Sequence, residues 1–129
     1  MVVKKIKKIL IVESDKIIAR VMKLKLEKED FEVESVFDGE EALNVLKKKK
    51  FDFVILDIVI PKIDGWKVLE NIKKKKNKTL VIIFTELRQT VDQEKAKKLK
   101  ADEYYIKTDT PIFEIIESVK RFSLNTKLS

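Results

Sequence analysis

The chain has 129 residues, 40% of them charged, and a formal net charge of +7 at pH 7. It contains no Cys and no His, which excludes disulfides, thiolate metal sites and a histidine that acts as general base or phosphate carrier. Its apolar runs are far too short to span a membrane or to form a signal-peptide core, so we expect a cytoplasmic protein without a membrane partner. With two Gly, two Pro and no low-complexity linker, we predict a single domain over 1–129, with its core at about 6–122 and no attached output domain.

Strand-like runs alternate along the chain with amphipathic segments of helical length. The first predicted strand is Ile6–Val12, and Ser14-Asp15 offers an N-cap for the helix that follows it. Phe31–Phe37 alternates as expected of an edge strand with one wetter face, the face that carries Glu32, Glu34 and Val36. Asp38-Gly39 ends this strand, and a second amphipathic helix follows.

The third predicted strand, Phe53–Ile58, is apolar throughout except for Asp57. A continuous apolar run is typical of a central parallel strand that is covered on both faces, where a charge has no structural purpose. Pro61 and Asp64-Gly65 then turn the chain into a third helix that begins near Trp66. Asp57 is therefore predicted at the carboxyl end of a buried strand.

The last part of the chain repeats the same alternation. Thr79–Phe84 is a buried strand that ends at Thr85, and a polar helix is predicted over roughly Thr90–Lys100. Tyr104–Ile106 is the fifth strand, and Thr110-Pro111 marks the start of the last helix. The pattern predicts an α/β fold: a flavodoxin-like (βα)5 doubly wound parallel sheet with strand order 2-1-3-4-5 in one three-layer domain.

In such a sheet the carboxyl ends of all strands lie along one edge, where open α/β sheets place their ligand sites. The polar residues that follow the strands are Glu13, Ser14, Asp15, Asp57, Thr85 and Lys107. Carboxylates and a main-chain carbonyl form an oxygen-rich site for a hard ion such as Mg²⁺. A Lys ammonium and a Thr hydroxyl can bind the oxygens of a transferred phosphoryl group, with Asp57 as the nucleophile.

Four segments together resemble the receiver domain of a bacterial or archaeal two-component response regulator. These segments are ILIVESD at Ile9–Asp15, DFVILDIVIPKIDGWKVL at Asp52–Leu69, VIIFT at Val81–Thr85 and ADEYYIK at Ala101–Lys107. The resemblance covers nearly the whole chain. It implies a protein that catalyses only its own phosphorylation and dephosphorylation and is otherwise not an enzyme.

The resemblance also implies a role for each matching residue. Asp57 would be the phosphoacceptor, and Mg²⁺ would be held by Asp57, by Glu13 and by the main-chain oxygen of Val59. Thr85 and Lys107 would hold the phosphoryl group. A histidine kinase or a phosphotransfer protein would supply that group from a phosphohistidine.

Tyr104 matches the aromatic switch residue of the family, which turns inward as the Thr moves toward the phosphate. The expected result is an altered contact with a downstream protein, through the face around Lys95, Tyr104, Tyr105 and Phe113. A second copy of the chain is another expected partner, in a dimer linked to phosphorylation.

Three positions depart from the family pattern. Ser14 stands where a second acidic metal ligand is usual, and a neutral hydroxyl binds Mg²⁺ poorly. Asp15 is better explained as a helix N-cap than as a replacement ligand. Glu86 follows Thr85 where a very small residue is usual, so its charge opposes a phosphoryl group there. The usual Lys-Pro step is Lys107-Thr108, and a cis bond before Thr would cost about 2.5–4 kcal/mol, so the loop is either strained or trans and rearranged.

These departures leave an alternative open, namely a pseudo-receiver that binds partners without phosphorylation.

A further departure is Lys100, which precedes Ala101 where the family usually has Gly. If the helix ends there in the left-handed conformation, Lys100 costs roughly 1–2 kcal/mol. We therefore expect Lys100 to lower the stability of the fold where the fourth helix ends.

Val59 and Leu87 lie two positions after Asp57 and Thr85, at sites that govern in this family how water reaches the acyl phosphate. Two apolar side chains are expected to exclude that water. If the chain is phosphorylated, we therefore expect a long-lived phosphate.

The basic residues are mostly lysines that precede the predicted strands, and so gather at the sheet edge opposite Asp57. The runs are Lys4-Lys5, Lys7-Lys8, Lys47–Lys50, Lys73–Lys76 and Lys97-Lys98-Lys100. Cations at helix C-termini are favoured by roughly 0.3–1 kcal/mol each, which explains part of this pattern. No recognition helix, zinc module or aromatic-interleaved basic motif is present, so we expect no specific nucleic-acid partner, only weak and salt-sensitive attraction to polyanions.

Overall fold

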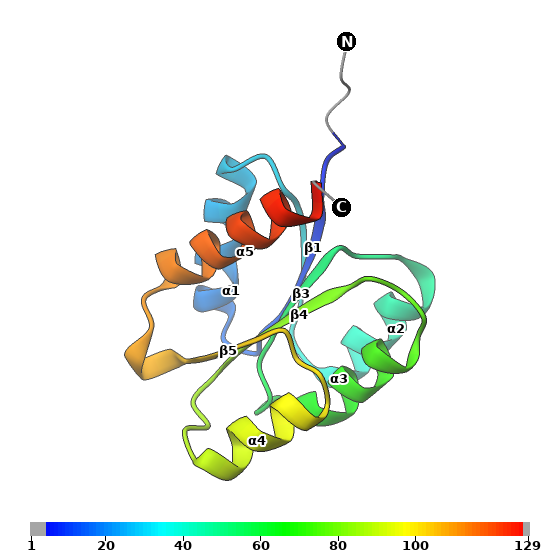
Figure 1. Cartoon of the computed structure of the whole chain (residues 1–129), viewed down its shortest axis with the longest axis vertical. Helices are drawn as coiled ribbons and strands as arrows, with labels where there is room; N and C mark the ends of the chain where they lie inside the picture. The colour runs from blue at the N-terminus through cyan, green and yellow to red at the C-terminus, as the bar shows by residue number, and fades with distance from the viewer. Residues whose placement is uncertain (1–4, 128–129) are drawn as a thin grey trace.

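A computed structural model describes residues 5–127 of the chain as a parallel five-stranded sheet with the order β2-β1-β3-β4-β5 (Figure 1). The elements in chain order are β1 (Lys8–Val12), α1 (Lys16–Lys28), β2 (Glu32–Val36), α2 (Gly39–Lys48), β3 (Phe53–Leu56), α3 (Gly65–Lys74), β4 (Leu80–Thr85), α4 (Thr90–Lys98), β5 (Glu103–Ile106), a short 3₁₀ turn η1 (Lys107–Asp109) and α5 (Ile112–Lys127). Every strand pair is parallel, and the predicted fold class and strand order are confirmed.

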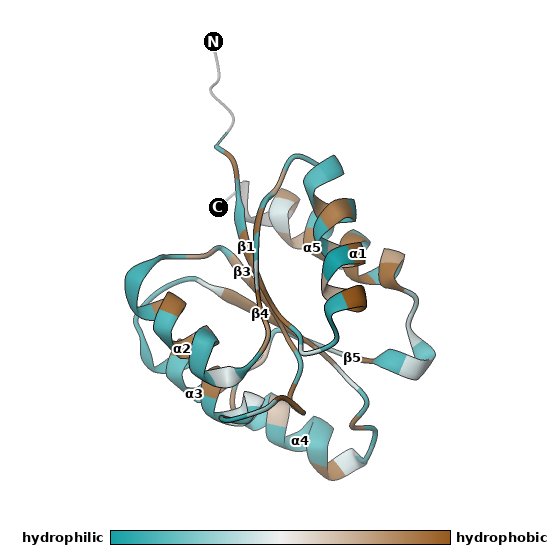
Figure 2. Ribbon diagram, turned by 180° about the vertical axis from the view of Figure 1, so that it is seen from behind, coloured by the Kyte–Doolittle hydropathy of each residue, from teal (hydrophilic) through white to brown (hydrophobic). Residues whose placement is uncertain are grey.

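The helices form a layer on each face of the sheet, with α1 and α5 on one face and α2, α3 and α4 on the other (Figures 1 and 2). Successive residues of the central strands bury alternately against the two layers. In β3, Phe53 and Ile55 pack in the cluster beneath α1 and α5, while Val54 and Leu56 pack in the cluster beneath α2 and α3. This coverage of both faces explains why the strand sequences are continuously apolar.

The bounds of several elements differ from the prediction by one or two residues, which is the usual uncertainty at element ends. β1 begins at Lys8, and Ile6 lies outside the sheet with its side chain 61% exposed. Val36, expected on the wetter face of β2, is buried because the cluster around α2 and α3 covers that face. α4 ends at Lys98, and α5 begins at Ile112.

The two glycines of the chain both lie where loops meet at the carboxyl edge of the sheet. The Gly39 N–H donates to the Pro61 carbonyl at 3.1 Å, and a Cβ at Gly39 would lie 1.9 Å from the Ile63 carbonyl oxygen. A Cβ at Gly65 would lie 2.5 Å from the Asp57 carbonyl oxygen. Both contacts leave no room for a side chain, so glycine is what lets the loop after Asp57 fold against its neighbours.

Lys100 adopts the left-handed conformation with φ 68°, as expected for a helix that ends without its usual Gly. We predict that Lys100→Gly raises the free energy of unfolding by about 1 kcal/mol, because relief of the strain exceeds the entropy gained by the unfolded chain. Glu94→Gly, in the exposed middle of α4, should lower it by a similar amount. Urea unfolding of both variants measures this, and a Lys100→Gly protein no more stable than the wild type would contradict it.

Candidate functional site

The carboxyl edge of the sheet brings together residues that are far apart in sequence. β1 and β3 are aligned so that Val12 lies opposite Leu56, and the Asp57 N–H donates to the Val12 carbonyl at 3.0 Å. Glu13 and Asp57 therefore leave neighbouring strands side by side. Lys107 leaves β5 at the same edge and reaches across to both carboxylates.

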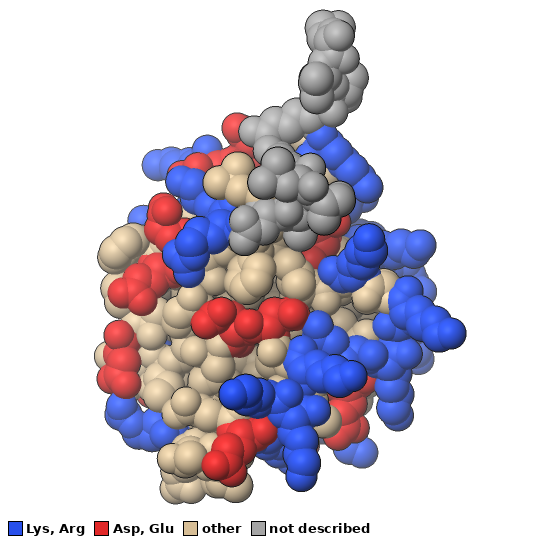
Figure 3. Space-filling model, in the orientation of Figure 1, with Lys and Arg blue, Asp and Glu red and all other residues tan. Residues whose placement is uncertain are grey.

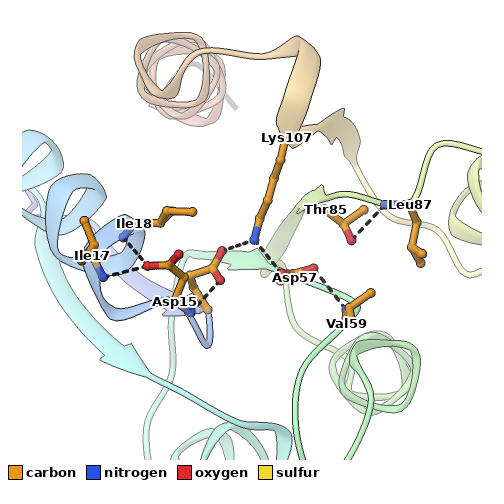
Figure 4. A network of polar contacts seen from close by, with 9 residues as sticks. Asp15, Ile17, Ile18, Asp57, Val59, Thr85, Leu87 and Lys107 are labelled. Atoms are coloured by element: carbon orange, nitrogen blue, oxygen red, sulfur yellow. Dashed lines mark hydrogen bonds and ion pairs between the residues drawn. The ribbon is translucent and has the colours of Figure 1, made fainter.

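Three charged side chains meet at this edge with little contact with solvent. Lys107 Nζ lies 2.6 Å from Glu13 Oε1 and 2.7 Å from Asp57 Oδ2 (Figure 4). The exposed fractions of the three side chains are 11% for Lys107, 2% for Glu13 and 6% for Asp57. Two buried carboxylates against one ammonium leave a local excess of negative charge, which is the electrostatic setting of a cation site.

Burial and charge shift the pKa values of two of these groups. Burial raises the pKa of the Glu13 carboxyl above its ordinary value, and the Lys107 ammonium only partly opposes this. Burial by itself would lower the pKa of Lys107, but its hydrogen bond and charge interactions with Asp57 and Glu13 outweigh burial, and the pKa is raised. Lys107 is therefore firmly protonated.

The backbone around the carboxylates holds them in place. The Asp15 N–H donates to Glu13 Oε2 at 3.0 Å, and the Val59 N–H donates to Asp57 Oδ1 at 3.1 Å. Asp15 itself caps α1, because its Oδ1 accepts from the N–H groups of Ile17 and Ile18. The predicted N-cap role of Asp15 is confirmed. The neighbouring Ser14 is exposed.

A second group of contacts joins the ends of β4 and β5. Thr85 is fully buried, and its Oγ1 accepts from the Leu87 N–H at 3.5 Å. The Tyr104 hydroxyl donates to the Leu87 carbonyl at 2.6 Å. Burial, with smaller effects from the negative charges of Asp92 and Asp57, raises the pKa of Tyr104 to about 12. The hydroxyl is therefore a donor throughout the physiological range, and it ties the loop after Thr85 to β5.

The loops that carry Thr85 and Lys107 also meet in a contact that the sequence analysis did not foresee. Arg88 donates to Asp109 at 2.8 Å and to the hydroxyl of Thr108 at 3.5 Å. The pair joins residues 21 positions apart, so no local spacing could have indicated it. The peptide bonds of residues 5–127 are all trans, so the Lys107-Thr108 step has the rearranged form, within η1.

The donor set fits a magnesium ion. No group of three acidic side chains suited to a metal exists within the described residues, because Ser14 is neutral and Asp15 is used as an N-cap. Glu13 and Asp57 remain, and Glu13 Oε1 is a buried acceptor that receives no well-directed hydrogen bond besides its ion pair. Mg²⁺ in proteins commonly binds one or two carboxylates and keeps several waters, so Glu13 and Asp57 are enough for such a site.

None of the helices within residues 5–127 combines the length and the apolar character that a transmembrane span requires.

Comparison with known proteins places the chain in a family. The model of the response regulator receiver domain matches residues 9–119. The chain therefore belongs to the receiver domains of two-component response regulators. Among curated proteins, the transcriptional regulatory protein DltR of Streptococcus agalactiae is 33% identical over 122 residues, which is 95% of this chain and 53% of that protein. The alkaline phosphatase synthesis transcriptional regulatory protein PhoP of Bacillus subtilis is 31% identical over 81% of this chain and 44% of its own length. The chain thus spans about half the length of these relatives.

Solved structures agree with this placement. A CheY-like receiver domain protein from Methanospirillum hungatei superposes with a TM-score of 0.88 at 26% identity, over 97% of this chain and all of that one. The response regulator TrrA of Thermotoga maritima, solved in complex with Mg²⁺ and BeF, superposes with a TM-score of 0.78 at 34% identity, over 90% of this chain and 98% of that one.

The buried ion pairs of Lys107 lead to a pH-dependent prediction in the absence of metal. Lys107→Met should lower the free energy of unfolding at pH 7 by about 3–5 kcal/mol, because it leaves two buried carboxylates without a counter-charge. Lys107 opposes the effect of burial on the pKa of Glu13, so without Lys107 that pKa would be raised further above 4.5. The stability of the variant would then fall more steeply than that of the wild type as pH rises above 4.5. The difference in the free energy of unfolding between the wild type and Lys107→Met should therefore shrink as pH is lowered from 7 toward 5.

Urea unfolding in EDTA at several pH values measures this deficit. Lys95→Met is the matched control, because Lys95 lies over the Trp66 ring and contacts no buried carboxylate. A deficit of Lys107→Met that is independent of pH would count against the charge explanation.

Proposed function

We propose that the chain is a single-domain response regulator that accepts a phosphoryl group on Asp57 and signals through altered protein contacts. The observation that supports this most directly is the buried contact of Lys107 with both Glu13 and Asp57. It joins a nucleophile, a second carboxylate and a cation at one edge of the sheet, next to Thr85. Membership of the receiver family supports the same role.

The proposed transfer is a displacement at phosphorus. A carboxylate oxygen of Asp57 forms the new P–O bond while the P–N bond to the imidazole of the donor phosphohistidine breaks, and the imidazole keeps the electron pair and later takes a proton from water. Lys107, 2.7 Å from Asp57 Oδ2, is close enough to neutralise oxygens of a group attached there. Hydrolysis of the acyl phosphate by water returns the carboxylate, and no other enzymatic activity is proposed.

Glu13, Asp57 and the main-chain oxygen of Val59 are the proposed ligands of Mg²⁺. The bound ion would neutralise negative charge on the phosphoryl oxygens as the transfer proceeds. Ser14 removes one carboxylate from this set, so we propose a lowered affinity for the ion.

The proposed signal passes from Thr85 to Tyr104 and reaches the surface of α4, β5 and α5. Tyr104 is linked through the Leu87 carbonyl to the loop after Thr85, so movement of Thr85 would disturb that contact. Lys95 on α4 and Phe113 on α5 are both exposed. The proposed partners are a histidine kinase or phosphotransfer protein, a downstream protein and a phosphorylation-linked second copy, all in the cytoplasm.

A second candidate function is a pseudo-receiver that binds its partners without phosphate. The observation in its favour is the weak metal set, since Ser14 is neutral and Asp15 caps α1. Glu86, exposed directly after Thr85, adds negative charge beside the path of an incoming phosphoryl group.

We predict that the chain gains the mass of one phosphate when it is incubated with Mg²⁺ and acetyl phosphate, and that Asp57→Asn does not. Intact-protein mass spectrometry measures the gain. Ser14→Asp, which restores the third carboxylate, should lower the Mg²⁺ concentration needed for half-maximal phosphorylation. If the folded wild type gains no phosphate at saturating Mg²⁺ from acetyl phosphate or from a kinase, the phosphate-independent function takes precedence.

The second prediction of this subsection concerns the lifetime of the phosphate. Val59 is 58% exposed beside the Asp57 carboxylate, and Leu87 packs against the core next to Thr85. Val59→Asn should shorten the half-life of phosphorylated Asp57 up to about tenfold, because a polar side chain can orient a water toward the acyl phosphate.

The decay of the phosphorylated mass after removal of acetyl phosphate measures the half-life. Val91→Asn on α4, at a similarly exposed apolar position, should leave it unchanged. A wild-type half-life no longer than that of Val59→Asn would rule out the proposed water exclusion.

A further inference from the structure

The sheet edge opposite Asp57 carries an excess of positive charge. The two loops that enter β3 and β4 from α2 and α3, residues 47–52 and 73–78, contain nine lysines and one acidic residue, Asp52. Figure 3 shows basic side chains gathered over α2, α3 and the loops after them, on the right of the view. The opposite ends of the same sheet therefore differ in charge.

Only a minority of these lysines have a polar partner. Lys49 pairs with Glu34 at 3.0 Å, Lys73 pairs with Asp102 at 2.7 Å, and Lys75 donates to the Leu46 carbonyl at 3.1 Å. The others have no ion pair or side-chain hydrogen bond within the described part of the chain. They are Lys47, Lys48, Lys50, Lys74, Lys76 and Lys78.

Helix capping accounts for only part of this excess. Lys47, Lys48 and Lys74 lie in the last turns of α2 and α3, where the helix dipole favours cations. Lys50, Lys76 and Lys78 lie beyond those turns, and the dipole effect fades within the last turn. Their mutual repulsion is uncompensated, so an external anion would stabilise this surface.

The lysines line two adjoining surface cavities. One cavity of ≈ 260 Å³ is lined by Lys47, Lys48, Lys49, Lys50 and Lys75, with no carboxylate. A second of ≈ 300 Å³ is lined by Lys5, Lys8, Lys50 and Lys78, with Asp52 as its one acidic residue. The two share Lys50, Phe51, Asn77 and Thr79, and so form one continuous depression, which we call the lysine groove.

We propose that the lysine groove binds the phosphate backbone of duplex nucleic acid without reading its sequence. Cations spread over two adjoining cavities fit a polyanion of many charges better than a single phosphate. Phe51 is only 7% exposed, so the groove offers no stacking platform for the bases of a single strand. Of the exposed large apolar side chains, only Ile6 lines it, which gives little to insert into a lipid surface.

This interaction is separate from the proposed phosphorylation. The groove and Asp57 lie at opposite ends of β3, so nucleic acid bound in the groove would leave the Asp57 edge open. The affinity would be in the range of non-specific binding, with dissociation constants of roughly 10⁻⁴–10⁻⁶ M, and would fall steeply with salt.

Fluorescence anisotropy with a labelled random-sequence DNA duplex tests the proposal, using the full chain at 50 and 200 mM salt. Contact with about six phosphates predicts an affinity loss of about 10³-fold between these concentrations. The triple variant Lys48→Glu, Lys50→Glu, Lys78→Glu, at three lysines that line the groove, should bind at least tenfold more weakly at 50 mM salt. It should also reduce the slope of log affinity against log salt by about 3.

The matched control is the triple variant Lys16→Glu, Arg20→Glu, Lys67→Glu, which has the same net charge but changes exposed residues in the N-terminal halves of α1 and α3, away from the groove. It should retain most of the affinity. The proposal is overturned if the two triple variants lose affinity equally, if the wild type does not bind the duplex at 50 mM salt, or if vesicles containing anionic lipid bind the wild type more tightly than the duplex does.

Discussion

The burial of Lys107 between Glu13 and Asp57 is the interaction on which the rest of the site depends. Removing three charged side chains from water is costly. Their mutual attraction offsets that cost only when the distances between them are short, as they are here. The site therefore contributes little net stability and demands a rigid frame. Buried charges that add little stability are typical of functional sites, and this site has an excess of negative charge that suits a cation.

The frame is supplied by backbone contacts at the ends of the strands. The Asp15 and Val59 N–H groups fix one oxygen of Glu13 and one of Asp57, which leaves the other oxygen of each for Lys107. Gly65 lets the loop after Asp57 approach the Asp57 carbonyl closely enough to begin α3. Both glycines of the chain contact this loop, so both are placed where the site is formed.

Much of this arrangement could be predicted from the sequence because it depends on periodicity and on topology. Continuous apolar strands predicted a sheet covered on both faces, and parallel order then placed Glu13, Asp57 and Lys107 at one edge. The helix N-cap at Asp15 and the left-handed Lys100 followed from local chemistry. The Arg88–Asp109 pair did not, because it joins two exposed side chains on separate loops whose orientation depends on the folded chain. Val36 was also misplaced, since its burial depends on how α2 and α3 pack against an edge strand.

The sequence also separates two kinds of charge along the same strands. At the carboxyl ends, Glu13, Asp57 and Lys107 are buried and paired, so each one is held at a defined position. At the amino ends, lysines are numerous and exposed, and most of those in the loops before β3 and β4 have no ion pair within residues 5–127, so their effect is a diffuse field that salt screens. A buried pair can direct chemistry at one atom, whereas a diffuse field can only attract a polyanion of many charges. The two ends of the sheet are therefore suited to different partners, and an effect of ionic strength on one of them need not alter the other.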